Sequence, residues 1–274
     1  MLHFPNAKIN LGLSVTEKRP DGYHNLETVF YPLPMLKDAL EVLPARDGAA
    51  SDMRISGKSI AGAVSQNLVW KALELLQTDF PEKVKPVSVH LLKTIPMGAG
   101  LGGGSADAAF MLQLLNRFFE LELSQDALAS YALQLGSDCP FFIYNTPHFA
   151  QGRGELLEPI PLDLSAYSLQ LVCPRIHVRT ASAFSDIVPG PAKFPLREIA
   201  ALPLSSWKEH IVNDFETTVF KVHPELARIK QRLYDEGALY AAMSGTGSAL
   251  YGLFEEGKQS SIADDEQAEV FYFH

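Results

Sequence analysis

The sequence predicts an α+β fold in two successive halves. Three observations support this prediction. Strands with period-two alternation and helices with apolar stripes alternate through the first 150 residues. A glycine-rich loop stands between one such strand and one such helix. Beyond about residue 155 a strand, a Pro- and Gly-rich stretch and a long helix follow. We therefore expect two domains, 1–154 and 155–274, with the boundary in the polar, glycine-containing segment 151–154.

The composition narrows the classes of function. The chain has 274 residues and a net charge of −9, from 23 basic and 32 acidic residues. This balance argues against a basic surface for nucleic acid. The N-terminus lacks the pattern of a signal peptide, and the longest charge-free window, 238–254, is interrupted by glycines. Two isolated cysteines argue against a metal or disulfide framework. We expect a soluble cytoplasmic protein without membrane or nucleic-acid partners; its oligomeric state is left open.

The first predicted element is a strand near the N-terminus. Apolar residues alternate with polar or small ones over 9–15, so one face of this strand is apolar. Lys8 and Asn10 share the opposite face, because side chains alternate along a strand. Residues 19–22 have the sequence Arg-Pro-Asp-Gly, in which proline and glycine favour a turn.

The remaining elements follow from the same two periodicities. Asn67 and Ser124 are typical helix caps, and Gly136 and Gly237 are typical residues after a helix end. The patterns predict helices at 67–77, 106–116, 124–135 and 224–236, and strands at 87–93, 139–144 and 168–173. Two further segments, 238–243 and 249–254, follow the last helix.

The glycine loop is the strongest functional signal. Five of the seven residues from 98 to 104 are glycine, which packing alone does not require. Such a loop brings bare backbone N–H groups close to an anion, and the helix that follows directs its positive end toward the same place. The hydroxyl of Ser105 lies at the helix start. A phosphate group is therefore the predicted ligand, against the alternative of a merely tight turn.

Two common phosphate loops fit this segment poorly. A Walker loop ends in Lys-Ser or Lys-Thr, whereas Ser105 and Ala106 stand here. Residues 98–103 match the spacing of a dinucleotide fingerprint, but that fingerprint requires a second strand ending in an acid. The acids within reach, Glu120 and Glu122, lie in a short link between two predicted helices.

The segment 96–109 resembles the phosphate loop of the superfamily of galactokinase, homoserine kinase, mevalonate kinase and phosphomevalonate kinase. Segments 5–11, 19–24 and 136–142, together with 244–248, resemble one branch of it, so the resemblance covers essentially the whole chain. It implies a two-domain α+β kinase with its active site in the cleft between the domains. It also implies that the γ-phosphate of ATP is transferred to the 2-hydroxyl of a cytidine diphosphate-linked methylerythritol, in the non-mevalonate isoprenoid pathway.

The resemblance assigns catalytic roles to two residues. It makes Asp138 the base that takes the proton from the substrate hydroxyl, and it places Lys8 beside it to stabilise the transferring phosphoryl charge. From the residues alone, Asp138 would also suit an Asx turn before Pro140. Lys8 would equally suit a solvated position on a strand.

The resemblance also assigns a site for the cytidine. Tyr23 would stack on the cytosine, His24 would form hydrogen bonds with it, and Phe184 would cover its other face. Without the resemblance, Tyr23 and His24 would be read as a half-buried hairpin pair. Further substrate contacts are expected from Asn10, Thr180 and Thr246, the last near the substrate phosphates or the methylerythritol part.

The expected ATP contacts centre on the glycine loop. Asn67 and Lys93 are placed near the adenine by resemblance, although Asn67 also caps a helix by composition. A magnesium ion is expected with the nucleotide, but no acidic residue in the sequence can be assigned as its ligand. The complete set is Asn67, Lys93, Pro96, Met97, Gly98, Ala99, Gly100, Leu101, Gly102, Gly103, Gly104 and Ser105.

Three alternatives remain open at the level of sequence. Another kinase of the superfamily, of the homoserine or mevalonate type, is the nearest, and the segments around Lys8 and Tyr23 argue against it. A nicotinamide-dependent dehydrogenase would use the same glycine spacing. A nucleotide-binding sensor without catalysis would keep the loop but would not need Asp138 beside Lys8.

Overall fold

The computed structural model describes residues 1–265 and 267–273. The chain divides into two compact units that interleave along the sequence. Unit 1 comprises Met1–Lys8, Pro32–Met97 and Gly102–Thr146; unit 2 comprises Ile9–Tyr31, Gly98–Leu101 and Pro147–His274. Residues 9–31 thus belong with the C-terminal part of the chain. A single domain boundary at 154/155 stays a prediction.

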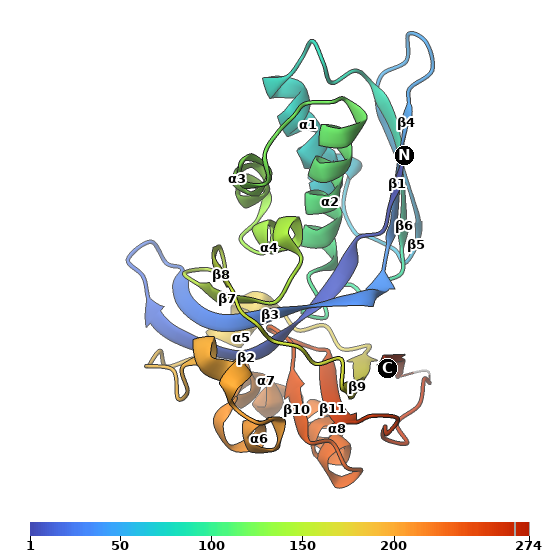
Figure 1. Ribbon diagram of the computed structural model, residues 1–274. Coiled ribbons are helices and arrows are strands. Elements are labelled where there is room, and N and C mark those ends of the chain that lie inside the picture. The colour runs from blue at the N-terminus through green and yellow to red at the C-terminus, as the bar shows by residue number, and fades with distance from the viewer. Residues whose placement is uncertain (266, 274) are drawn as a thin grey trace. The chain divides into compact units, whose positions relative to one another are not determined.

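Unit 1 is a four-stranded sheet with helices on one side of it (Figure 1). Its strand order is β1-β4-β6-β5, with β5 and β6 parallel and the other neighbours antiparallel. Apolar residues face each other across the sheet, as in the pair Leu40 and Leu91. The elements are β1 (Leu2–His3), β4 (Ala39–Pro44), β5 (Asp52–Gly57), β6 (Val87–Lys93), a short 3-10 turn (Val64–Gln66), α1 (Leu68–Asp79), α2 (Gly103–Phe118), α3 (Gln125–Leu135) and α4 (Cys139–Tyr144).

Capping side chains define where two of these helices begin. The side chain of Asn67 accepts a hydrogen bond from Val69 N at 2.9 Å, and the Ser124 hydroxyl accepts one from Ala127 N at 3.2 Å. The predicted starts of α1 and α3 are therefore confirmed. The predicted helix over 106–116 is also confirmed, but α2 begins earlier, at Gly103, directly on the glycine loop.

The prediction of a strand over 139–144 is wrong, because this segment is the helix α4. The segment is a short, continuous apolar run, which suits a buried strand or a buried helix equally. Pro140 stands in the first helical turn, where its missing N–H costs nothing. Phe141 and Phe142 are both fully buried, since α4 packs against α2 and α3. Gly136 ends α3 as expected, but in extended conformation rather than the left-handed one.

Unit 2 contains two four-stranded sheets, β2-β3-β7-β8 and β10-β11-β9-β12. In the second sheet, β9 lies between two antiparallel neighbours, and the predicted strand at 168–173 is confirmed there. The segments 238–243 and 249–254 overlap the strands β10 and β11 of the same sheet. Two strands cross from one unit to the other: β2 (Asn6–Lys18) begins in unit 1 and includes Lys8 there, and β3 (His24–Lys37) ends in unit 1. The other elements are β7 (His148–Gln151), β8 (Leu156–Pro159), β9 (Tyr167–Pro174), α5 (Thr180–Phe184), 3-10 turns (Leu196–Ala201 and Leu204–Ser206), α6 (Trp207–His210), α7 (Phe215–Val222), α8 (Pro224–Asp235), β10 (Tyr240–Met243), β11 (Leu250–Glu255) and β12 (Ala268–Phe273).

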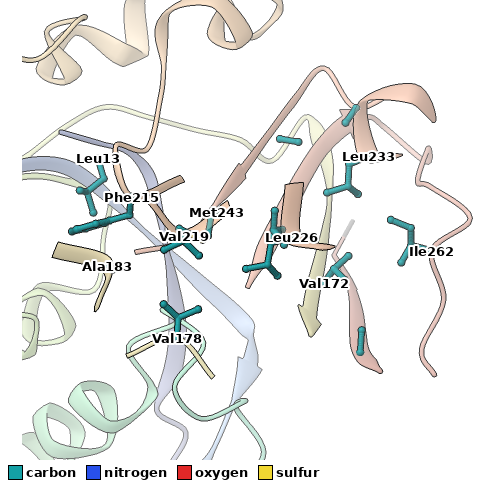
Figure 2. Close-up of a cluster of buried hydrophobic side chains, with 14 of the residues drawn as sticks. Leu13, Val172, Val178, Ala183, Phe215, Val219, Leu226, Leu233, Met243 and Ile262 are labelled. Carbon is teal, nitrogen blue, oxygen red and sulfur yellow. The ribbon is translucent and has the colours of Figure 1, made fainter. Parts of the chain in front are cut away.

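The core of unit 2 joins residues from both ends of the chain (Figure 2). Leu13 and Val15 of β2 belong to the same buried cluster as Val219 of α7 and Leu226 of α8. The segment 9–31 is therefore an integral part of this core. Among the helices of residues 1–265 and 267–273, none is both long and apolar enough to cross a membrane.

Candidate active site

The glycine loop adopts backbone conformations that explain several of its glycines. Gly98, Gly100 and Gly102 have φ values of 65°, 78° and 69°, a region that other residues rarely adopt. A Cβ atom at Gly100 would lie 2.0 Å from the carbonyl oxygen of Ser244. At these positions the conformation and the close backbone approach require glycine.

Gly104 has no such explanation within the chain. It lies in the first turn of α2, and a Cβ atom placed there would have no atom of the described residues within 4 Å. Its φ is not in the left-handed region. A glycine in a helix costs about 1 kcal/mol relative to alanine, and here nothing in the fold offsets that cost. The open space lies at a helix N-terminus, where backbone N–H groups bind anions.

Lys8 and Asp138 form an ion pair next to the loop. Lys8 Nζ lies 3.7 Å from Asp138 Oδ2, and the side chains are 4% and 35% exposed. A Cβ atom at Gly102 would lie 3.1 Å from Lys8 Cε, so the lysine passes directly under the loop. Burial lowers the pKa of Lys8, and the neighbouring carboxylate of Asp138 opposes this shift. The sequence-predicted catalytic pair is thus brought together with the glycine loop.

Asp138 does not use its side chain to form the turn before α4. It occupies the N-cap position of this helix, but its carboxylate makes no capping hydrogen bond. The next residue, Cys139, is buried, and its thiol forms a hydrogen bond with Ser105. Burial raises the pKa of the Cys139 thiol to about 12, so it stays protonated. The loop serine and the segment that carries Asp138 are therefore in direct contact.

In unit 2, the aromatic residues of the predicted cytidine site are only partly arranged as a base sandwich. The ring of His24 stacks on Phe184, with centroids 4.8 Å apart and planes 24° apart. Phe184 also contacts Phe215 edge-to-face at 4.7 Å. Tyr23 is 57% exposed, and the guanidinium of Arg153 lies 5.1 Å from its ring centroid. His24 therefore covers one face of Phe184, a contact that the sequence did not reveal.

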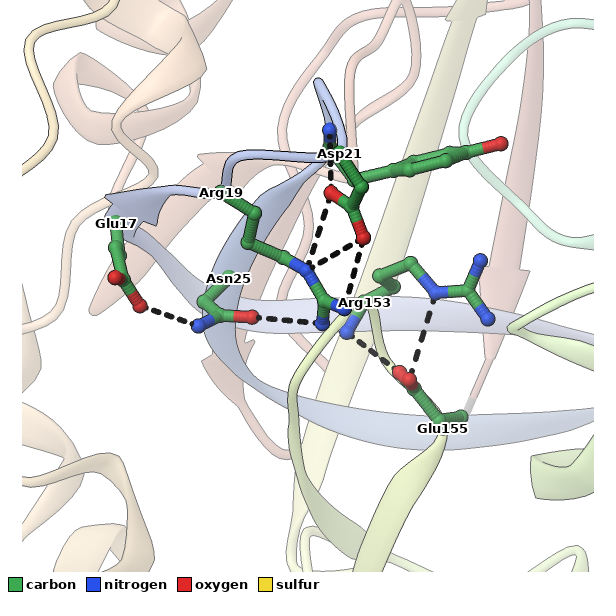
Figure 3. Close-up of polar contacts among 7 residues, drawn as sticks. Glu17, Arg19, Asp21, Asn25, Arg153 and Glu155 are labelled. Carbon is green, nitrogen blue, oxygen red and sulfur yellow. Dashed lines mark hydrogen bonds and ion pairs between the residues drawn. The ribbon is translucent and has the colours of Figure 1, made fainter.

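The turn that presents Tyr23 and His24 is braced by polar contacts (Figure 3). Arg19 pairs with Asp21 at 2.9 Å, and Asp21 Oδ1 accepts the backbone N–H of Tyr23 at 3.1 Å. Gly22 N donates to Arg19 O at 3.1 Å, which confirms the predicted turn. Arg19 also donates to Asn25. These contacts hold the short connection between β2 and β3 in one shape.

The other predicted substrate residues differ in their surroundings. Asn10 is buried, and its side-chain nitrogen donates to the hydroxyl of Thr28 at 2.9 Å. Thr180 begins α5 and is exposed. Thr246 is half-buried in the turn between β10 and β11. This turn contacts the loop, because Ser244 donates its side-chain hydroxyl to Gly100 O at 2.9 Å.

The two residues predicted near the adenine have other roles in the fold. The side chain of Asn67 caps α1, as described above. Lys93 is 1% exposed, and its ammonium donates to carboxylates of Asp38 and Asp107. This side chain has no exposed surface. The assignment of Lys93 as an adenine contact is therefore corrected: it is a buried residue at the base of the loop.

Sequence reasoning missed Asp38, Asp107 and Arg153. One signal for Asp107 was present: it is the only charged residue in the apolar segment 106–116. Asp38 and Arg153 stand in connecting segments, where a charged residue is ordinary and nothing in the pattern distinguishes them. Among residues 1–265 and 267–273, no group of three or more His, Cys, Asp or Glu side chains is arranged to hold a metal ion.

The chain is similar to known proteins over most of its length. The family models "GHMP kinases N terminal domain" and "GHMP kinases C terminal" match residues 67–146 and 197–269. A 4-diphosphocytidyl-2-C-methyl-D-erythritol kinase of Bacteroides thetaiotaomicron is 52% identical over 93% of this chain and 92% of its own length. A crystal structure of 4-(cytidine 5'-diphospho)-2C-methyl-D-erythritol kinase is 34% identical, with a TM-score of 0.77 over 92% of this chain and 90% of that chain.

A more distant structure shows the same fold. The crystal structure of homoserine kinase from Cytophaga hutchinsonii has a TM-score of 0.66 and covers 98% of this chain and 94% of its own, at 15% identity. The identity to the first two proteins, over nearly their whole lengths, is far higher than this. The chain therefore belongs to the 4-diphosphocytidyl-2-C-methyl-D-erythritol kinases, within the GHMP kinase family of ATP-dependent small-molecule kinases.

Proposed function

We propose that this protein transfers the γ-phosphate of ATP to the 2-hydroxyl of 4-diphosphocytidyl-2-C-methyl-D-erythritol. The observation that carries the proposal is the contact of the Lys8 and Asp138 pair with the glycine loop. A carboxylate that can accept a proton, an ammonium and an anion-binding loop stand within a few ångströms of one another. This combination is what phosphoryl transfer to an alcohol requires.

The reaction uses Asp138 and Lys8 in different ways. The substrate hydroxyl oxygen attacks the γ-phosphorus in line, the bond to the β,γ-bridging oxygen breaks, and ADP leaves with that oxygen. The hydroxyl proton passes to the half-buried carboxylate of Asp138. Lys8 lies under the loop and stabilises the charge on the transferring group. Most of the rate enhancement comes from positioning and charge stabilisation.

The loop fits the phosphates of ATP. The open space at Gly104 and the N–H groups of the first turn of α2 offer room and hydrogen-bond donors to an anion. Magnesium is usually bound through nucleotide phosphates and only one or two protein oxygens, so it needs no dedicated cage of side chains. When bound with ATP, it neutralises charge on the β- and γ-phosphates.

Tyr23, His24 and Phe184 are the proposed cytosine site. Tyr23 offers an exposed ring for stacking. Phe184 is only partly buried, so its ring retains surface for contact with the base, and the ring nitrogens of His24 offer hydrogen bonds to the base edge. Stacking tolerates any base, so the selection of cytosine falls to His24 and nearby backbone groups.

A panel of phosphoryl acceptors tests the proposal. The protein is incubated with ATP, magnesium and one acceptor: 4-diphosphocytidyl-2-C-methyl-D-erythritol, homoserine or mevalonate. We expect acceptor-dependent ADP release with the first alone, and a phosphomonoester on its 2-hydroxyl by phosphorus and carbon NMR. Release with homoserine or mevalonate instead would overturn the substrate assignment. ATP binding without transfer to any acceptor would favour a sensor.

A further inference from the structure

Three charged side chains lie buried together at the base of the glycine loop. Asp38, Lys93 and Asp107 are 1%, 1% and 2% exposed, and we call them the buried charge cluster. Lys93 Nζ donates to Asp38 Oδ2 and to Asp107 Oδ2, the latter at 2.7 Å. One ammonium thus holds two carboxylates that come from different segments of unit 1.

The cluster contacts the backbone on both sides of the loop. Before the loop, Asp38 Oδ1 accepts the backbone N–H groups of Thr94 and Ile95, at 2.5 and 2.9 Å. After the loop, a Cβ atom at Gly103 would lie 3.3 Å from Lys93 Nζ. Asp107 follows one helical turn later on α2. The same three side chains therefore fix where the loop leaves β6 and where it enters the helix.

Stability alone does not account for this arrangement. Removing charges from water costs several kcal/mol per ion, and buried ion pairs are often no more stabilising than apolar residues of the same size. Asp107 Oδ1 is buried and has no hydrogen-bond partner among the described residues. Burial raises the pKa of Asp107 to about 7; Lys93 from β6 opposes this shift, and Asp38 from the segment between β3 and β4 adds to it. Burying the cluster therefore costs free energy of folding.

We propose that Asp38, Lys93 and Asp107 are positioning residues that set the affinity of the glycine loop for ATP. They hold both ends of the loop in the shape that exposes its N–H groups, through hydrogen bonds between charged side chains. This inference rests on the proposed function. It predicts an effect on nucleotide binding and little effect on the transfer step, because none of the three side chains touches the reacting atoms.

Substitutions at Asp107 test the proposal. Asp107→Ala removes one carboxylate from Lys93, and we expect it to weaken ATP binding about 10-fold or more, the effect of losing a buried charged hydrogen bond. The rate at saturating ATP and the Michaelis constant of the acceptor should stay within about twofold of wild type. The matched control is Asn116→Ala on the same helix, which removes two 3.0 Å hydrogen bonds to Leu123 but touches no part of the loop. It should leave ATP affinity unchanged.

The pH dependence of ATP binding separates positioning from a purely structural role. In wild type, the carboxylate of Asp107 takes up a proton as pH falls through about 7 and loses its charged hydrogen bond with Lys93, so the dissociation constant of ATP should rise as pH falls from 8.5 to 6 in excess magnesium. Asp107→Asn keeps the size of the side chain and cannot ionise. Its dissociation constant for ATP should therefore not change with pH over this range. In the control variant Asn116→Ala, the dissociation constant should change with pH as in wild type.

Each outcome decides the inference. Wild-type ATP affinity in folded Asp107→Ala, or an equal loss in Asn116→Ala, would overturn it. If Asp107→Ala does not fold, Asp107→Asn still decides, because a pH profile identical to that of wild type would overturn the charge effect. A wild-type enzyme that does not transfer phosphate from ATP would instead refute the proposed function, which separates the two failures.

Discussion

Asp107 and Asp138 show how one residue type serves two purposes within unit 1. The side chain of Asp107 is 3% exposed and shares the Lys93 ammonium with Asp38, so it has no access to a substrate. The side chain of Asp138 is 35% exposed and faces Lys8 beside the loop. Only the second is placed to accept a proton from a bound alcohol, since a base must reach the proton that it takes.

Replacement of Asp138 by Asn tests its role as the base. Asp138→Asn keeps the shape of the side chain but cannot accept a proton, so the single-turnover rate at saturating substrates should fall about 10²–10⁴-fold. Lys8→Met should also lower the rate, and the double variant should lose less than the product of the two losses if the residues act as a unit.

Both substrates should bind Asp138→Asn almost as tightly as wild type, because the loop and the aromatic residues are untouched. Asp52→Asn on β5, whose carboxylate pairs with Ser88 and Arg54, is a matched control and should keep the wild-type rate. A rate of Asp138→Asn within about threefold of wild type would refute the base assignment.

Tyr23 and Phe184 should differ when each is replaced by Ala. Tyr23 is exposed, so Tyr23→Ala should leave the melting temperature unchanged and raise the Michaelis constant of the cytidine substrate about 5- to 150-fold, the worth of about 1–3 kcal/mol of stacking. Phe184 also packs against His24 and Phe215, so Phe184→Ala should in addition lower the melting temperature.

The Michaelis constant of ATP should stay near the wild-type value in both aromatic variants. Steady-state kinetics with each substrate varied in turn provides this measurement. A rise confined to the ATP constant would mean that the aromatic residues belong to the nucleotide pocket.

At the scale of elements, the N-terminus of α2 contains glycines needed for packing and a glycine proposed to make room for phosphate. Gly102 and Gly103 are closely packed: a Cβ atom at the first would lie 2.9 Å from the Phe142 ring, and at the second 3.0 Å from Ile95. Valine at either position would disturb the packing of α2 as well as phosphate binding. Gly104, which faces open space, separates these effects.

Gly104→Val therefore tests the phosphate site cleanly. The Cβ atom of the new side chain meets no atom of the described residues within 4 Å, so we expect the melting temperature to change by no more than a few degrees. We expect ATP affinity, measured by calorimetry, to fall at least about 10-fold, because the new methyl groups occupy the space of a phosphate. Unchanged ATP affinity would show that the anion does not lie over this turn.

Most elements could be predicted from the sequence because their patterns are local. The caps Asn67 and Ser124 and the alternation over 87–93 depend only on neighbouring residues, and these elements are confirmed. The helix α4 could not be predicted in this way, since six residues are too few to distinguish a buried strand from a buried helix by periodicity. Its packing against α2 and α3 decides the outcome.

The candidate site likewise contains residues whose roles could be predicted from the sequence and residues whose contacts could not. The loop could be predicted from its glycines, whereas the pairing of Lys8 with Asp138 was implied only by the resemblance to the kinase superfamily. The partners of Lys93 could not be predicted, since Asp38 is 55 residues away in sequence and is brought near only by the sheet. The contact of His24 with Phe184 likewise joins positions 160 residues apart, and no local pattern encodes it.

At the scale of the whole molecule, the two units are not consecutive pieces of chain. Unit 2 takes residues 9–31 from near the N-terminus, and these supply β2 and the strand β3 that pairs with β7. Leu13 and Val15 also fill the core of unit 2. A cut after residue 146 therefore leaves the C-terminal fragment without two strands and part of its core.

We expect the fragment 147–274 to be unfolded or molten when it is produced alone. Burial of Leu13 and Val15 and the hydrogen bonds of β3 cannot form, and a partly emptied core loses its fixed packing before its secondary structure. Amide chemical-shift dispersion and near-ultraviolet circular dichroism measure this. The control is a fragment in which residues 9–31 are joined to 147–274 by a flexible linker, and it should recover the chemical-shift dispersion. Native spectra of the fragment 147–274 alone would contradict the role given to β2 and β3.

The contacts of Asn10 bear on how the protein is made in the cell. Its backbone N–H donates to Ser244, and its carbonyl accepts from Tyr251, 234 and 241 residues later in the chain. A ribosome adds about 5–20 residues per second, so the apolar strand that carries Asn10 waits on the order of 10–50 s for these partners. During that time its buried face is exposed to other nascent chains. Protection of the emerging N-terminus by a chaperone is therefore expected to govern the yield of active enzyme.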